Sequence, residues 1–313
     1  MQISKDLSSF RKLELKEHSK PYLIFNGLMK NPYFLVAPAV IIAIITTIYS
    51  MVFCIVLAFC DWDLLGGSMK FVGMKNFKFI FTSPDFVLAL RNTVIYMVVI
   101  VLASTVLKVA GAIFLNKNTT RHNLVQTIMF TPHIIASVAV TTIWKFLMIP
   151  EGGVLNMVIE LFGGEGIGWY MSEDWSLFSL ILIALWSGMG YGVLLIIAGL
   201  RSIPGYVYEA ARLDRSRGFH CFWHITMPLL SPTLFYVIFT TMVGTFGSFD
   251  MVDQLTNGGP KNSSTLIAYY IYQQGLRFMH YGRAMAAAVI LLIITSTLAV
   301  INFAIGNKKV HYQ

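Results

Sequence analysis

Long apolar blocks, each of about 20 residues, recur along this chain and constrain its fold more than any other feature. Six segments are long enough for an α-helix to cross the hydrocarbon core of a bilayer: 34–59, 93–115, 124–148, 177–200, 234–249 and 285–305. Only 12% of the residues are charged, roughly half the fraction of a typical soluble domain. We therefore predict an all-α membrane protein with six transmembrane helices. The fifth segment is short, and its helix could begin as early as Met227, with Pro228 and Pro232 in its first turns.

The basic residues predict the orientation of these helices. Of the 23 Lys and Arg residues, 14 fall in segments that face the cytoplasm if the N-terminus lies inside, 7 fall in the outer loops, and 2 lie within spans. An excess of positive charge marks the cytoplasmic side. We predict a cytoplasmic N-terminal tail at 1–33, a transmembrane domain at 34–305 with a long cytoplasmic loop at 201–233, and a cytoplasmic C-terminal tail at 306–313.

Charge and motif content exclude several classes of function. The net charge of +8 is explained by topology and by attraction to anionic lipid of the inner leaflet, so no nucleic-acid partner is expected. The three cysteines are too widely spaced for a disulfide framework or a zinc site. The sequence contains no G-x-x-x-x-G-K-[ST] motif, so we expect no ATP-hydrolysing site in this chain.

Two lysines lie inside predicted spans, where a charge costs about 2.5–3.5 kcal/mol near the helix centre. Lys108 and Lys145 have two interpretations: cations of a transport pathway, or side chains that extend along the helix to the membrane surface. We favour the second interpretation for both.

His220 and His224 are four residues apart and would share one face of a helix, which is a spacing that can hold a metal ion. They lie among Phe219, Phe222 and Trp223, so we favour an aromatic docking face without metal.

The loop before the fifth span holds an Ala-rich, charged segment between two apolar runs. We expect a short helix over 205–214 that starts after Pro204, a break at 215–218, and a second aromatic helix ended by Pro228. Such a helix pair could dock into a partner protein or lie on the lipid surface. Glu209 and Asp214 disfavour an anionic leaflet and favour the partner.

This segment resembles the E-A-A signature of permease subunits of bacterial ABC importers, the inner-membrane components of binding-protein-dependent transport. Glu209, Ala210, Ala211, Ile225 and Pro228 match the pattern, whereas Met227 replaces Leu and Arg215 replaces the usual Gly. The resemblance is to the sugar branch, of maltose and glycerol-phosphate type, and it extends to DWDLLGG at 61–67, FVGMKNF at 71–77, AGLRSIP at 198–204 and QLTNGGP at 254–260.

The resemblance implies a type I ABC importer permease fold in the bacterial inner membrane. It implies a heterodimer with a second permease, two ATPase subunits that bind ATP and Mg²⁺, and an external solute-binding protein. This chain would then bind no cofactor and carry no catalytic residue. It would contact the ATPase through its E-A-A helix, with Glu209 accepting charge-assisted hydrogen bonds and the alanines setting the approach distance. The positions expected to couple to the ATPase are Glu209, Ala210, Ala211, Asp214 and Arg215.

The resemblance also implies that solute contacts lie partway through spans three, four and five. The matching positions are His133, Ser137, Gly188, Gly244, Thr245 and Ser248. Aromatic faces suit sugars, and Trp186, Tyr191 and Phe246 could supply them, although helix packing explains Trp186 and Phe246 equally well.

The expected function is ATP-driven import of a sugar, an oligosaccharide or a larger glycan. The alternatives are an ABC permease for another solute, an ion-coupled secondary transporter, or a structural or receptor protein. An ion-coupled transporter commonly needs intramembrane carboxylates, and no Asp or Glu lies centrally in a predicted span.

Overall fold

The computed structural model describes residues 31–62, 67–216 and 218–309, and it divides into two compact units, Met1–Val56 and Leu57–Gln313. Residues 1–30 and 310–313 of the two predicted tails, residues 63–66 of the 61–67 motif and Arg217 lie outside the described residues.

The described part of the first unit belongs to one continuous apolar helix over Pro32–Ala58. This helix comprises α3 (Pro32–Ala43), the π-helical segment η1 (Ile44–Tyr49) and α4 (Ser50–Ala58). It starts at Asn31, whose side chain accepts a hydrogen bond of 3.0 Å from the Tyr33 N–H, followed by proline in the first turn.

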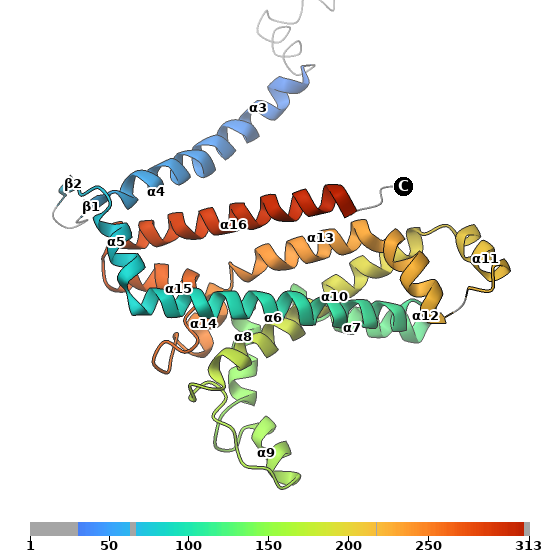
Figure 1. The fold of residues 1–313 in the computed structure, drawn as a ribbon. Helices are drawn as coiled ribbons and strands as arrows, with labels where there is room; N and C mark the ends of the chain where they lie inside the picture. The colour runs from blue at the N-terminus through green and yellow to red at the C-terminus, as the bar shows by residue number, and fades with distance from the viewer. Residues whose placement is uncertain (1–30, 63–66, 217, 310–313) are drawn as a thin grey trace, which may run out of the picture. The chain divides into compact units, whose positions relative to one another are not determined.

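The second unit is a helical bundle with one short antiparallel hairpin. Its strands are β1 (Cys60–Trp62) and β2 (Met69–Phe71), with Asp61 opposite Lys70. Its helices, labelled in Figure 1, are α5 (Lys75–Thr82), α6 (Pro84–Leu115), α7 (Thr120–Ile134), α8 (Ser137–Leu147), α9 (Val154–Leu161), α10 (Ser176–Ser202), α11 (Gly205–Leu213), α12 (Gly218–Cys221), η2 (Phe222–Thr226), α13 (Met227–Thr245), α14 (Phe249–Leu255), α15 (Ile267–Tyr272), η3 (Gln273–Arg277) and α16 (Tyr281–Lys309).

The long helices α6, α10 and α13 pack against one another, α7 packs on α10, and α16 packs on α13. In Figure 1, α11 and α12 lie at one end of this bundle, whereas the hairpin, α5 and α15 lie at the other. One buried cluster, which includes Ala112, Val193 and Leu230, joins α6, α10 and α13. A second cluster, which includes Tyr96, Leu180 and Val252, joins α6, α10 and α14.

Five of the described helices are long and apolar enough to cross a membrane. The bent pair of α7 and α8 gives a sixth span if the two helices are counted as one. The expectation of one continuous helix over 124–148 is wrong, because α7 and α8 meet at an angle of 102°. Pro132 removes one backbone donor from the last turn of α7, Ile135 then adopts an extended conformation, and Ala136 is also non-helical.

Other predicted boundaries also differ from the structure. The fifth span, predicted at 234–249 with a possible start at Met227, is α13 over Met227–Thr245. The second span begins at Pro84 instead of residue 93, because proline in the first turn loses no helical hydrogen bond. Pro228 does not end the aromatic helix as expected. The π-helical turn η2 leads directly into α13, whose first turn accommodates the proline that lacks an N–H.

The end of α11 explains how Arg215 can occupy the position at which the E-A-A signature usually has glycine. Arg215 has a φ of 57°, in the left-handed region that glycine adopts most easily. Its N–H donates to the Arg212 carbonyl at 3.1 Å, and the Ser216 N–H donates to the Ala211 carbonyl at 2.9 Å. These two bonds form a Schellman motif, so the turn has the glycine-type geometry without glycine.

We expect Arg215→Gly to stabilise this turn by about 1 kcal/mol, because glycine removes the steric cost of the left-handed conformation. Hydrogen exchange of the Ser216 amide should slow about fivefold, since 1 kcal/mol corresponds to that factor. Arg215→Ala, which keeps a Cβ, is the matched control and should leave the exchange rate near that of the natural chain. Equal exchange rates in both variants would contradict this explanation.

Gly190 allows α10 to approach α7 very closely. A Cβ atom at Gly190 would overlap the Met129 carbonyl oxygen and lie 2.7 Å from the Phe130 Cα. Backbone atoms cannot move aside as a flexible side chain can, so this contact requires glycine.

Gly190→Ala should therefore destabilise the bundle by about 1–3 kcal/mol, the usual cost of overpacking. The measurement is the thermal unfolding midpoint of the purified protein in detergent. Gly188→Ala is the matched control on the same helix, because a Cβ there would meet no atom within 4 Å. A Gly190→Ala protein as stable as this control would show that the helices are not in contact.

Candidate functional site

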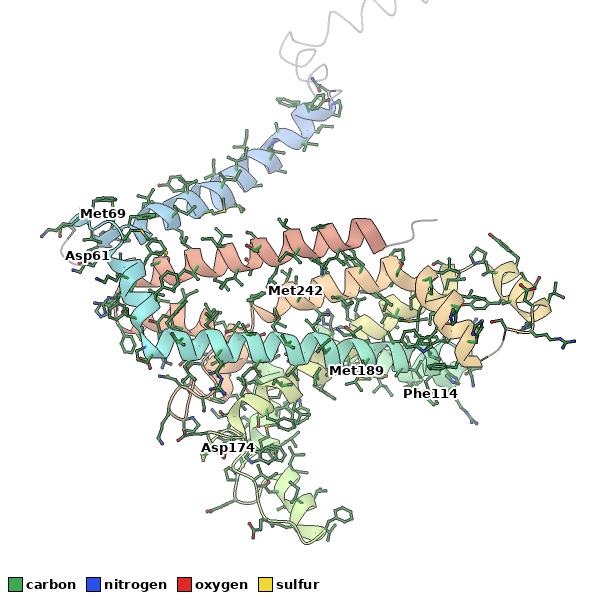
Figure 2. All side chains as sticks on the ribbon, viewed as in Figure 1. Asp61, Met69, Phe114, Asp174, Met189 and Met242 are labelled. Atoms are coloured by element: carbon green, nitrogen blue, oxygen red, sulfur yellow. The ribbon has the colours of Figure 1, made fainter. Side chains whose placement is uncertain are left out.

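A cavity of about 280 Å³ lies among α6, α7, α10, α13 and α14. It is lined by six of the residues expected to face the solute, which come from three separate sequence regions: His133, Gly188, Tyr191, Gly244, Thr245 and Ser248. Met189 of α10 and Met242 of α13, labelled in Figure 2, are the sequence neighbours of the cavity residues Gly188 and Thr241. Ser137 lines a neighbouring cavity of about 260 Å³ that shares His133 and Gly188 with the first. The structure thus brings seven of the nine expected residues together.

One part of the cavity wall is a pair of stacked rings. The His133 and Tyr191 ring centroids are 4.7 Å apart, and the ring planes differ by 13°. His133 lies in the last turn of α7, immediately before the bend, and Tyr191 lies in α10. Stacked aromatic faces of this kind suit the C–H face of a sugar ring.

Hydroxyl groups supply much of the polar lining. The Tyr96 hydroxyl donates to the Ser248 Oγ at 3.0 Å, which links α6 to the start of α14. Thr240 and Thr245 donate to carbonyls of their own helix, Tyr236 at 2.8 Å and Met242 at 2.6 Å. Because those protons are engaged, the threonine oxygens can still accept hydrogen bonds from a solute.

The remaining two expected solute residues lie elsewhere. Trp186 is 44% exposed and packs edge-to-face on Trp144, with ring centroids 5.5 Å apart. Neither Trp186 nor Phe246 lines either of these cavities. For Trp186 this placement agrees with helix packing, the alternative that the sequence left open.

The prediction that both lysine side chains extend along the helix to the membrane surface is wrong for Lys108. Its side chain is 5% exposed, it lines the cavity, and its Nζ donates to the Thr241 Oγ1 at 2.8 Å. The short side chains around it leave room inside the bundle, so the lysine stem does not extend to the surface. Lys145 of α8 donates to the Gln254 carbonyl of α14 at 2.8 Å.

Several cavity residues escaped the sequence analysis: Tyr96, Ile100, Ser104, Ser187, Thr240 and Thr241. A usable signal exists in α6, where Tyr96, Ile100, Ser104 and Lys108 repeat every four residues and share one helix face. Three polar side chains on one face of a membrane helix indicate a bundle interior or a cavity.

The second candidate surface is the E-A-A helix, α11. Glu209, Ala210, Asp214 and Arg215 are exposed. Ala211 is only 4% exposed, so its side chain faces this chain's own interior. The expectation from the resemblance, that this alanine sets the approach distance of a partner, is therefore wrong for Ala211. The Tyr208 hydroxyl and the Thr226 Oγ1 are 3.2 Å apart and join α11 to η2.

Two apolar residues on the outer face of α11 were not expected. Tyr206 is 70% exposed and Leu213 is 85% exposed. With Ala210 they occupy positions i, i+4 and i+7, so they form one apolar stripe beside Glu209. An apolar stripe next to a single carboxylate is typical of a protein-docking surface.

His220 and His224 stack on each other, with ring centroids 4.1 Å apart, and Phe219 packs on Trp223 in the same spacing. Within the described ranges, no group of three His, Cys, Asp or Glu residues is placed to hold a metal ion. The two ring contacts agree with an aromatic face on this segment.

This chain is similar to known proteins in sequence and in fold. A permease protein for sn-glycerol-3-phosphate transport, UgpA of Agrobacterium fabrum, is 29% identical over 90% of this chain and 96% of its own length. The arabinooligosaccharides transport system permease protein AraP of Bacillus subtilis is 28% identical over 91% of both chains.

Among solved structures, a chain of a bacterial ABC transporter involved in import of the acidic polysaccharide alginate superposes with a TM-score of 0.78 at 22% identity. The match covers 88% of this chain and 94% of that chain. The family described as binding-protein-dependent transport system inner membrane component matches residues 108–311, about two thirds of the sequence. This chain therefore belongs to the family of inner membrane components of binding-protein-dependent transport systems.

Proposed function

We propose that this chain is a membrane-spanning permease subunit of an ATP-driven, binding-protein-dependent ABC importer for a carbohydrate. Membership of the permease family is the observation that carries this proposal. The cavity supports it, because stacked rings and hydroxyl groups are the side chains that recognise a hydroxyl-rich solute.

The relatives support a carbohydrate or polyol derivative as solute. Their names specify glycerol phosphate, arabinooligosaccharides and alginate, all of which carry hydroxyl groups. These solutes differ in size and charge, so the relatives support the chemical class and leave the individual solute open.

The importer needs further subunits: a second permease, two ATPase subunits and an extracytoplasmic solute-binding protein. A related structure contains a periplasmic protein bound to an alginate pentasaccharide, which supports the binding-protein partner. ATP and Mg²⁺ would bind to the ATPase subunits and no cofactor to this chain. Both termini and α11 would then face the cytoplasm, and surrounding lipid would contact the apolar helices.

The transport step follows from the position of the cavity and of α11. Solute hydroxyls exchange hydrogen bonds with water for bonds to the cavity side chains, and the rings of His133 and Tyr191 cover an apolar face of the solute. ATPase closure moves the docked α11, which is joined to η2 and through it to α13. Since α13 lines the cavity, this motion opens the cavity toward one side of the membrane or the other.

An ion-coupled secondary transporter is the main alternative. Such proteins commonly couple transport to carboxylates inside the membrane. No Asp or Glu is present among the residues that line the two cavities described above. The proposal of an ATP-driven importer therefore remains the better one.

We expect Glu209→Ala to leave membrane insertion intact and to uncouple ATP hydrolysis from transport. The variant loses charge-assisted hydrogen bonds worth about 1.5–3 kcal/mol, so solute uptake into proteoliposomes should fall on the order of tenfold or more. The control is Glu165→Ala, which removes an exposed carboxylate from the loop between α9 and α10. Normal uptake in the Glu209→Ala importer would remove the coupling role of α11.

We also expect the tagged chain to bring its partners through affinity purification from its native membrane. Mass spectrometry should identify a second E-A-A permease, an ATPase with a phosphate-binding loop, and a solute-binding protein. A chain that purifies alone, stable and folded, would contradict the proposed assembly.

A further inference from the structure

We propose that Lys108, Ser104 and Thr241 form an anion-binding subsite in the cavity, and that the transported carbohydrate carries a carboxylate or a phosphate group. This inference rests on the proposed function and adds the charge of the solute to it.

Lys108 brings a positive charge into the cavity without a neutralising partner. Its side chain is 5% exposed, and neither of the two ion pairs found among the described residues involves it. No acidic residue is present in the lining of the cavity. Its ammonium group has three N–H donors, and the hydrogen bond of 2.8 Å to the Thr241 Oγ1 uses one of them. The other donors are available to an anionic group in the cavity.

Ser104 provides a second, independent indication of a ligand. It lies one helical turn before Lys108 and lines the same cavity. The residue is 4% exposed, and its Oγ has no hydrogen-bond partner among the described residues. A buried hydroxyl without a partner is unfavourable, so such a group commonly marks the place of a bound molecule.

The neighbouring helix is shaped to accommodate the lysine. A Cβ atom at Gly192 would lie 2.6 Å from the Lys108 Cε and 3.0 Å from its Cγ. Gly192 thus leaves the space that the lysine stem occupies between α6 and α10. The next residue toward the N-terminus, Tyr191, belongs to the stacked pair that also lines the cavity.

The cavity therefore combines two kinds of recognition: a cation with two hydroxyl-bearing neighbours, and stacked rings. This combination fits a sugar or polyol with one acidic substituent. An ammonium group acts as a point charge and binds a carboxylate or a phosphate with equal geometric freedom, whereas arginine would favour planar bidentate pairing.

The test uses the purified complex of both permeases and the ATPases, without the binding protein. The probes are sodium D-glucuronate and sn-glycerol 3-phosphate, each compared with its neutral counterpart, D-glucose or glycerol, at an ionic strength matched with sodium chloride. Saturation-transfer NMR titrations give the dissociation constants. We expect at least one charged probe to bind tenfold or more tightly than its neutral counterpart, and the probe that does so distinguishes carboxylate from phosphate.

Lys108→Met should reduce this preference to less than twofold, and Ser104→Ala should reduce it about three- to tenfold while binding of the neutral probe stays unchanged. Lys145→Met removes another lysine of a membrane helix, does not touch the cavity, and should keep the full preference. If Lys108→Met lowers the yield of assembled complex, the test depends on Ser104→Ala alone, which should reduce the charge preference about three- to tenfold.

Two results would overturn the subsite: charged probes that bind the natural complex no more tightly than the neutral ones, or a charge preference that survives in Lys108→Met and Ser104→Ala. ATP hydrolysis stimulated by the binding protein is measured on the same preparation. A complex that is stimulated but shows no charge preference refutes the anion subsite alone, whereas failure to assemble with the ATPases refutes the proposed function.

Discussion

The need to satisfy every backbone N–H and C=O group inside a bilayer is the constraint on which this structure depends. Hydrocarbon offers no hydrogen-bond partners, so non-helical backbone at membrane depth occurs only where it is buried in protein or lines a water-filled space. The chain follows this rule at two interruptions. Two non-helical residues separate α7 from α8, and a short turn separates α13 from α14. Ile135 lies in the first interruption and Ser248 in the second, and each lines one of the two neighbouring cavities.

The interruptions thus have a functional consequence. The bend after α7 places His133 at a helix end, where its ring stacks on Tyr191 of α10. The turn after α13 places Ser248 within reach of the Tyr96 hydroxyl of α6. Polar groups from distant parts of the sequence meet in this way in an otherwise apolar bundle, and Lys108 adds a charge to them. In the proposed importer, these groups would bind the polar solute.

The sequence allowed the fold class, the approximate helices and six of the fifteen cavity-lining residues to be predicted, because membrane spans and the family motifs are strong local signals. It did not allow the 102° bend at Pro132 to be predicted, since proline is also found in helices that are kinked but continuous. The inward position of Lys108 depends on the space left by Gly192, which belongs to a different helix. The burial of Ala211 likewise depends on tertiary packing. The left-handed Arg215 shows that a turn geometry can persist after its usual glycine is lost.

Thiol accessibility at Ser187 would test most directly whether the cavity is the path of the solute. The three natural cysteines, Cys54, Cys60 and Cys221, are first replaced by alanine, and Ser187→Cys is introduced. A membrane-impermeant thiol reagent is then applied from either side of proteoliposomes that contain the complete importer. If the cavity alternates between the two sides, the cysteine reacts from one side without nucleotide and from the other when the ATPases are trapped closed on ATP. A cysteine that reacts equally in both states, or from neither side in either state, would contradict the account.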